Sequence, residues 1–150
     1  MSFQKDVDKS LPGQEEFAKH IEVCWDCELR QDIRTINNKK DFNPIDYMLI
    51  KKDTNKVMGY IELKNRSFES TKYQTLIIDH QKMVEIRKKA LFSSLPVFLG
   101  IRYTNVDLYY KYDSAHFFPI YHSGRTTMKR NEYDIKEVEY IPLKLFKELK

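Results

Sequence analysis

The sequence contains few cysteines, and this scarcity limits the metal and redox chemistry that it can support. Cys24 and Cys27 form a C-x-x-C motif that begins four residues after His20. A structural zinc site needs four ligands, and the sequence has no second C-x-x-C or H-x-x-x-H motif to complete one. A thioredoxin-like role would need a strand before the motif and a helix after it, whereas here the motif closes a predicted helix. We therefore expect buried, unreactive cysteines, with a zinc site across an oligomer interface as the alternative.

Long apolar runs, internal repeats and low-complexity segments are also absent from the sequence. No N-terminal stretch resembles a signal peptide and no run is long enough to cross a membrane, which predicts a cytoplasmic protein without a membrane partner. A length of 150 residues with 41% hydrophobic residues fits one domain with a proper core. The net charge of +4 is compatible with nucleic-acid binding and equally typical of an ordinary soluble surface.

The most informative stretch runs from Asn43 to Arg66 and predicts two strands joined by a tight turn. In the second strand, VMGYIELK, side chains alternate between the two sheet faces, so Glu62 and Lys64 share one face. The first strand, IDYMLI, carries a single acid, Asp46, in an otherwise apolar run. A carboxylate and an ammonium side by side on a sheet face are either a site or a plain ion pair.

The turn between these strands fixes which residues face each other. A three-residue loop over positions 53–55, with its asparagine in the left-handed conformation, would pair Lys52 with Lys56 and place Asp46 opposite Glu62. Opposed side chains have Cβ atoms about 4.5–5.5 Å apart, so the two acids should repel and one should resist ionising. A divalent cation would remove this conflict, and carboxylate oxygens suit Mg²⁺ or Mn²⁺.

These residues resemble the motif of the PD-(D/E)xK nuclease superfamily. Pro44-Ile45-Asp46 is similar to the family's PD with one residue inserted, and the strand YIELKNR is similar to its hydrophobic-E-x-K-x-R ending. The resemblance implies an α/β (α+β) fold with a restriction-endonuclease-like αβββαβ core, in which helices flank a mixed central sheet. This core would span about residues 13–112 of a single domain, followed by a C-terminal β/α extension over about 113–150.

The resemblance also implies a function, a Mg²⁺-dependent endodeoxyribonuclease of restriction, homing or resolvase type. Asp46, Glu62 and the carbonyl of Leu63 would bind the metal, with Mn²⁺ as a substitute, and Lys64 would position or deprotonate the attacking water. DNA is the implied partner, and a homodimer or higher homo-oligomer is expected because many small relatives act as dimers. The alternatives are an inactive nucleic-acid-binding module of the same fold and a structural protein with a coincidental motif.

Acidic residues of the first helix are further candidates for the site. A helix from Gly13 to Trp25 is predicted by an apolar stripe, and Glu16 lies at the border of that stripe. In the resembling family the first helix often supplies an acid to the metal site, which makes Glu16 the first candidate and Glu15 the second. The alternative is that both are ordinary solvated acids.

A second predicted helix, from Thr71 to Ser93, contains Gln81 and Lys82. In branches of the family such as the RecU-type Holliday junction resolvases, a Gln or Lys on this helix faces the active site. The resemblance implies that Gln81 holds the water or a phosphate and that Lys82 contacts the DNA backbone. The alternative is a solvated pair.

The remaining predicted elements are a first strand and a series of strands in the second half of the chain. The predicted bounds are strands at 27–36, 96–104, 106–112, 116–121 and 135–141, with 96–104 as the buried central strand, and a short helix at 142–149. A basic, glycine-containing loop covers residues 123–131. We expect phosphate contacts from Arg66 and from this loop through Arg125, Lys129 and Arg130.

Overall fold

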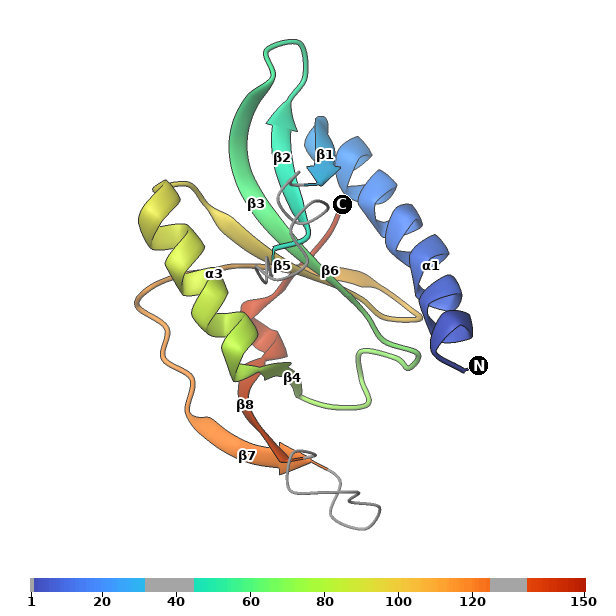
Figure 1. Cartoon of the computed structure of the whole chain (residues 1–150), viewed down its shortest axis with the longest axis vertical. Helices are drawn as coiled ribbons and strands as arrows, with labels where there is room; N and C mark the ends of the chain where they lie inside the picture. Colours follow the sequence, from blue (N-terminus) through green and yellow to red (C-terminus); the bar gives the residue numbers. More distant parts are fainter. Residues whose placement is uncertain (1, 32–44, 125–134) are drawn as a thin grey trace.

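The computed structural model describes residues 2–31, 45–124 and 135–150, which form helices packed against two β-sheets (Figure 1). The elements in chain order are α1 (Ser2–Trp25), β1 (Cys27–Gln31), β2 (Tyr47–Lys51), β3 (Lys56–Asn65), β4 (Thr75–Asp79), α3 (His80–Ser93), β5 (Val97–Arg102), β6 (Asp107–Lys111), β7 (Ile120–Gly124), β8 (Ile135–Pro142), the 3-10 helix η2 (Leu143–Leu145) and β9 (Lys147–Glu148).

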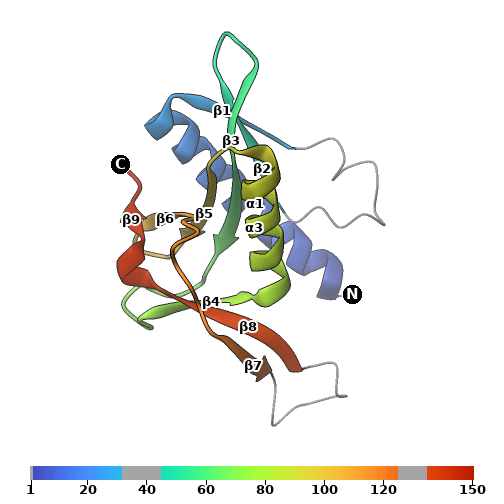
Figure 2. The ribbon, with the colours of Figure 1, turned by 90° about the vertical axis from the view of Figure 1, so that its left-hand side faces the viewer.

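The larger sheet has the strand order β1-β2-β3-β5-β6-β9. Its central pair, β3 and β5, is parallel and the other pairs are antiparallel, so the sheet is mixed, as predicted. Residues of α1 share one apolar core with β2 and β3, and residues of α3 share a second core with β5 and the smaller sheet. The predicted α/β fold, with helices flanking a mixed sheet, is confirmed, and Figure 2 shows α1 and α3 beside β3.

The smaller sheet has the order β4-β8-β7 and joins the middle of the chain to its end. We predicted a helix from Thr71, and this is wrong for its first third because residues 75–79 form β4. Leu76 and Ile78 point into the core while Ile77 points outward, an alternation that antiparallel pairing with β8 stabilises. The side chain of Asp79 then caps α3 by accepting from the backbone N–H of Gln81 at 2.9 Å.

Three other boundaries differ from the predicted ones. Helix α1 begins at Ser2 rather than near residue 13, and the predicted strand at 116–121 is found at 120–124. The predicted terminal helix at 142–149 is a 3-10 turn followed by β9, which pairs with β6 and extends the larger sheet. The predicted strand at 135–141 is confirmed, and the part of the predicted first strand beyond Gln31 lies outside the described residues. No helix in the described segments is both long and apolar enough to cross a membrane.

The β2–β3 hairpin reaches the predicted register by a different route. Lys51, not Lys52, pairs with Lys56, so the loop has four residues instead of three. A register shift between Leu49 and Ile50 then inserts one extra residue into β3. The left-handed conformation predicted for Asn55 is present, with φ of 55°. The bulge cancels the longer loop, so the pairing at the far end of the hairpin is as predicted.

Candidate active site

Two acids meet where β2 enters the sheet beside β3. The last pair of the hairpin is Tyr47 with Ile61, so the next step brings Asp46 level with Glu62. The carboxyl groups of Asp46 and Glu62 lie close enough for Asp46 to raise the pKa of Glu62, and Oδ2 of Asp46 also accepts from the backbone N–H of Leu63 at 3.0 Å. The structure therefore brings together the two acids on which the sequence interpretation rests.

Burial makes it unfavourable for both carboxyl groups of this pair to be ionised at once. Glu62 is only 3% exposed. Desolvation, followed by the hydrogen bond and the negative charge of Asp46, raises the pKa of Glu62 to about 9, against the opposing effect of Lys82. At neutral pH the pair consequently needs either a shared proton or a cation beside it.

Two ammonium groups approach the pair from different elements. Lys82, in the first turn of α3, places Nζ 2.9 Å from Oε1 of Glu62. Lys64 follows Glu62 by two residues on β3 and shares its face; burial lowers the pKa of Lys64, while the charges of Glu62 and Asp46 act to raise it. We predicted Lys82 as a contact to the DNA backbone, and this stays a prediction; in the structure its ammonium lies against Glu62.

The groups here that could hold a small, hard cation are the two carboxylates and a backbone carbonyl. In a strand, the N–H and C=O of one residue point toward the same neighbour, so the carbonyl of Leu63 faces the edge at which its N–H meets Asp46. Within the described segments, no group of three or more His, Cys, Asp and Glu side chains could hold a metal. Two carboxylates and one carbonyl would leave several positions to water and substrate, which is the mode that Mg²⁺ prefers.

Helix α1 reaches the site through a neutral residue rather than through an acid. Nε2 of Gln14 donates to Oδ2 of Asp46 at 3.3 Å. Glu16 does not approach the pair as predicted: its carboxylate is 76% exposed and accepts from Nη1 of Arg102 at 3.3 Å. Glu15 is also exposed. Gln14 precedes the buried Phe17 by three residues and so continues the apolar stripe, which is the signal that could have identified it.

Gln81 likewise does not face the acid pair. It is exposed, and its Nε2 donates to Oε1 of Glu85 one turn further along α3 at 3.0 Å. Successive helix residues differ by about 100°, so Gln81 and the buried Met83 point about 200° apart. Lys82, one residue nearer to Met83, is the one that reaches the sheet.

Comparison with known families is consistent with this geometry. Residues 4–149 match the model of a family described as "phage putative PDDEXK endonuclease". The chain belongs to this nuclease family. Membership of the PD-(D/E)xK superfamily, inferred above from Asp46 and Glu62-Leu63-Lys64, is thereby confirmed. No curated protein matches the chain.

A buried ion cluster in this nuclease-family chain fixes the helix that carries Lys82. The carboxylate of Glu139 on β8 is fully buried. Its Oε2 contacts Nδ1 of His80 at 2.7 Å and Nη1 of Arg87 at 2.8 Å, and Oε1 accepts from Nη2 of Arg87. Residues 80 and 87 lie two turns apart on one face of α3, so Glu139 holds both ends of this stretch of the helix against the smaller sheet. This cluster could not be predicted from the sequence because Glu139 is more than 50 residues away from both His80 and Arg87.

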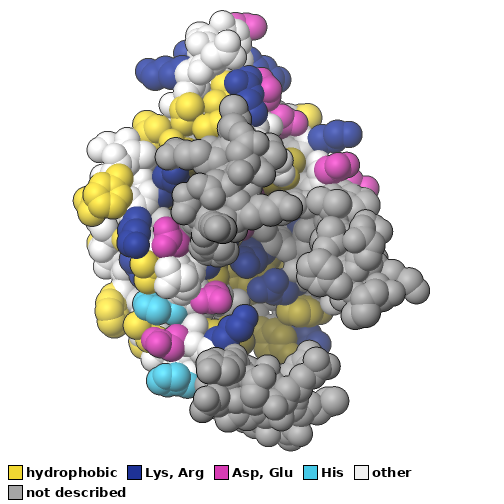
Figure 3. Space-filling model, in the orientation of Figure 1, with side chains coloured by type: hydrophobic (Ala, Val, Ile, Leu, Met, Phe, Trp, Pro, Cys, Tyr) yellow, Lys and Arg dark blue, Asp and Glu magenta, His cyan; other side chains and the backbone are white. Residues whose placement is uncertain are grey.

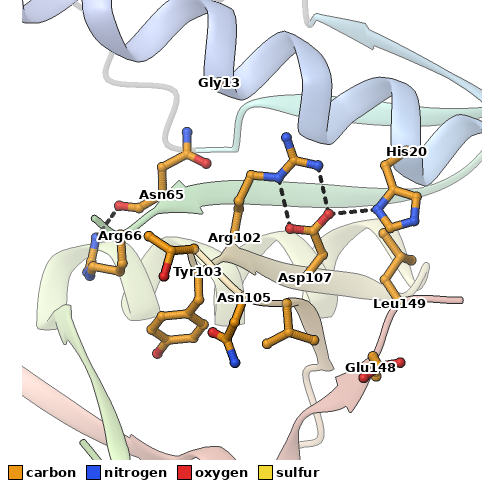
Figure 4. A pocket seen from close by; sticks show the side chains of 12 residues that line it. Gly13, His20, Asn65, Arg66, Arg102, Tyr103, Asn105, Asp107, Glu148 and Leu149 are labelled. Carbon is orange, nitrogen blue, oxygen red and sulfur yellow. Dashed lines mark hydrogen bonds and ion pairs between the residues drawn. The ribbon is translucent and has the colours of Figure 1, made fainter. Parts of the chain in front are cut away.

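A second charged cluster lies in a hollow of about 660 Å³ on the α1 side of the sheet (Figure 4). The guanidinium of Arg102 bonds the carboxylate of Asp107 through two hydrogen bonds of 2.8 Å, and His20 contacts the same carboxylate at 2.6 Å. Arg102 also holds Glu16. These charges pair among themselves, which explains why Glu16 is drawn away from the acid pair.

The predicted nucleic-acid contacts fall into two groups. Arg66, just after β3, donates from Nη1 to the carbonyl of Asn65 and from Nη2 to the carbonyl of Ile77 on β4 at 3.3 Å. It therefore bridges the ends of the two sheets. Arg125, Lys129 and Arg130 lie outside the described residues.

The cysteines take the places predicted for them. Both are free thiols, Cys27 is buried and Cys24 partly so. Burial, followed by the charge of Glu22, raises the pKa of the Cys27 thiol, so it stays protonated at neutral pH.

Proposed function

We propose that this chain is a Mg²⁺-dependent endodeoxyribonuclease. The observation that carries the proposal is the buried pair of Asp46 and Glu62, in a chain that belongs to a nuclease family; the spacing of the two acids resembles the superfamily motif, and a bound cation would relieve their mutual repulsion. The proposed ligands are these two carboxylates and the carbonyl of Leu63, with Mn²⁺ as a substitute for Mg²⁺.

The side chains around the pair suit hydrolysis of a phosphodiester. A bound divalent cation would offset phosphate charge and lower the pKa of a water ligand. Lys64 lies on the same face as Glu62 and can hold the attacking water or neutralise charge that develops on the phosphate. Gln14 fixes the orientation of Asp46 by donating to Oδ2, and Lys82 neutralises Glu62.

Plasmid cleavage tests this proposal. The wild type should cut supercoiled plasmid, linear duplex or a four-way junction in Mg²⁺ or Mn²⁺ but not in EDTA. Asp46→Asn and Glu62→Gln should each lower the rate by at least about 10²-fold, since they remove a ligand charge without changing size. Asp26→Asn is the matched control, because Asp26 is exposed and contacts Lys52 near the hairpin loop.

Near-normal cleavage by either site variant would refute the assignment. Binding of DNA without cleavage by the wild type, in any of these metal ions, would favour the alternative of an inactive binding module.

A further inference from the structure

The outer face of the smaller sheet carries a stacked pair of tyrosines. Tyr121 on β7 and Tyr140 on β8 have ring centroids 5.1 Å apart and planes 24° from parallel. Tyr121 is 47% exposed, and Ile77, which pairs with Tyr140 across β4 and β8, is 46% exposed. Tyr121 lies directly opposite Val138, so the two rings and Ile77 share one face. This outer-face patch points away from the core that Leu76, Ile78 and Ile141 form on the other side.

The patch is continuous with the proposed active site. Lys64 and Arg66 follow Glu62 along β3, and Arg66 donates to the backbone carbonyl of Ile77 at the free edge of β4. From that edge, Tyr140 is the neighbour of Ile77 and Tyr121 stacks on Tyr140. Each step from the acid pair to the aromatic rings is therefore a direct neighbour or a contact. Figure 3 shows Lys and Arg side chains next to hydrophobic side chains in the lower half of one face of the molecule.

The charges around the patch favour a polyanion. Arg66 lies at one edge, and Lys136, exposed on the same face as Tyr140, lies toward the other end. Asp79, on the corresponding side of β4, already accepts from the backbone N–H of Gln81 as the cap of α3. A protein partner would have to place acids over Arg66 and Lys136 and apolar groups between them, whereas a nucleic-acid strand has this arrangement in every nucleotide.

We propose that the outer-face patch binds unpaired nucleotides of the DNA substrate, with bases continuing the stack that Tyr121 and Tyr140 form and the backbone passing Arg66 toward the acid pair. The substrate class of the proposed nuclease is then DNA with a single-stranded segment, such as a flap, a splayed arm or a gapped duplex. This inference rests on the proposed function.

The dimensions and chemistry of the patch suit a few bases. Two strand spacings separate β4 from β7, about 10 Å, which is the thickness of roughly three stacked bases at about 3.4 Å each. Bases in an intact duplex present only their edges, so a flat aromatic surface can stack on them only where the strands are separated. Stacking of this kind tolerates any base, since every base has a π face.

Binding without cleavage is the sharpest test. Fluorescence anisotropy in EDTA would compare a labelled 15-nucleotide oligo-dT with a 15-base-pair duplex, for the wild type and for Tyr121→Thr. Threonine keeps strand propensity while removing the ring. Tyr121→Thr should weaken single-strand binding about 5- to 150-fold and duplex binding less than 3-fold. Tyr121→Phe should restore wild-type affinity because it restores the ring.

Two further variants complete the test. Phe92→Ala, which removes an exposed aromatic ring at the far end of α3, is the matched control and should bind both ligands as the wild type does. Lys136→Gln should reduce the salt dependence of single-strand binding by about one phosphate contact.

The outcomes separate this inference from the function on which it rests. Unchanged single-strand affinity in folded Tyr121→Thr would overturn the inference. It would also be overturned if the wild type sedimented as a dimer and Tyr121→Thr as a monomer, because the patch would then bind a second copy. Failure of the function shows instead as cleavage that survives Asp46→Asn, whatever the anisotropy reports.

Discussion

Substitution of Glu139 would test how strongly its ion pair holds α3, the helix that carries Lys82, against the smaller sheet. Its carboxylate is fully buried and makes two hydrogen bonds to Arg87 and one to His80, all on α3. The hydrogen bond and the charge of Glu139 raise the pKa of Arg87, against the opposing effect of burial, so the guanidinium of Arg87 is charged throughout the range in which the protein would be studied. Glu139→Gln keeps the size of the side chain and removes the charge.

The expected cost follows from the geometry. Removing one partner of a buried ion pair costs about 3–5 kcal/mol because the other charge is left without compensation. The side chain of Arg87 is 31% exposed, so water can solvate part of it and the lower end, about 3 kcal/mol, applies. For a chain of this length, a loss of about 3 kcal/mol lowers Tm by roughly 6–12 °C.

Urea unfolding, followed by circular dichroism, and calorimetry would measure both quantities. Glu137→Gln is the matched control, since Glu137 is exposed two residues away on β8 and its substitution should change stability by less than about 0.5 kcal/mol. A loss below about 1 kcal/mol in Glu139→Gln would refute the reasoning, because the cluster would then contribute no more than a surface pair.

Two other substitutions address the reaction and the acid stability of the fold. Lys64→Ala should lower the cleavage rate by about 10²-fold or more. Its Mg²⁺ affinity, measured by calorimetry, should stay within a few fold of the wild type because an ammonium cannot ligate a cation, and loss of metal binding by a folded variant would contradict this role. Burial alone would raise the pKa of Asp107, but hydrogen bonds from Arg102 and His20 hold it below its ordinary value, so its stabilising contribution is complete above about pH 4 and is lost as the pH falls through the lowered pKa. Urea unfolding should therefore show Asp107→Asn less stable than the wild type at pH 6, with the difference shrinking as the pH falls below about 4. A difference that does not change with pH would be evidence against this linkage.

The acid pair could be predicted because it depends on local rules. Alternation along β3 decides that Glu62 and Lys64 share a face, and the turn decides which residue of β2 faces Glu62. The loop is one residue longer than predicted, but a bulge in β3 restores the pairing. A one-residue slip would have placed Asp46 on the other face, so the bulge preserves the feature that the site requires.

The accessory residues could not be predicted because they depend on packing between distant elements. The stretch from Thr75 to Asp79 is short and apolar, and such a run is compatible with a helix or a strand when read alone. Its partner, β8, is about 60 residues away in the sequence. Pairing with that strand turns residues 75–79 into β4 and delays the start of α3 to His80.

The late start of α3 decides which of its side chains reaches the acids. With His80 as the first residue, Lys82 lies in the first turn, and long helical side chains point back toward the N-terminus, which here adjoins the sheet. Two features set the rotation of the helix about its axis: the side chain of Met83 is buried in the core, and Glu139 contacts residues 80 and 87. If α3 were rotated by about 100° about its axis, Gln81 would take the position of Lys82 and Glu62 would lose its contact with an ammonium group. The contacts of Glu139 with α3 and the contact of Lys82 with Glu62 are therefore consequences of the same placement of α3.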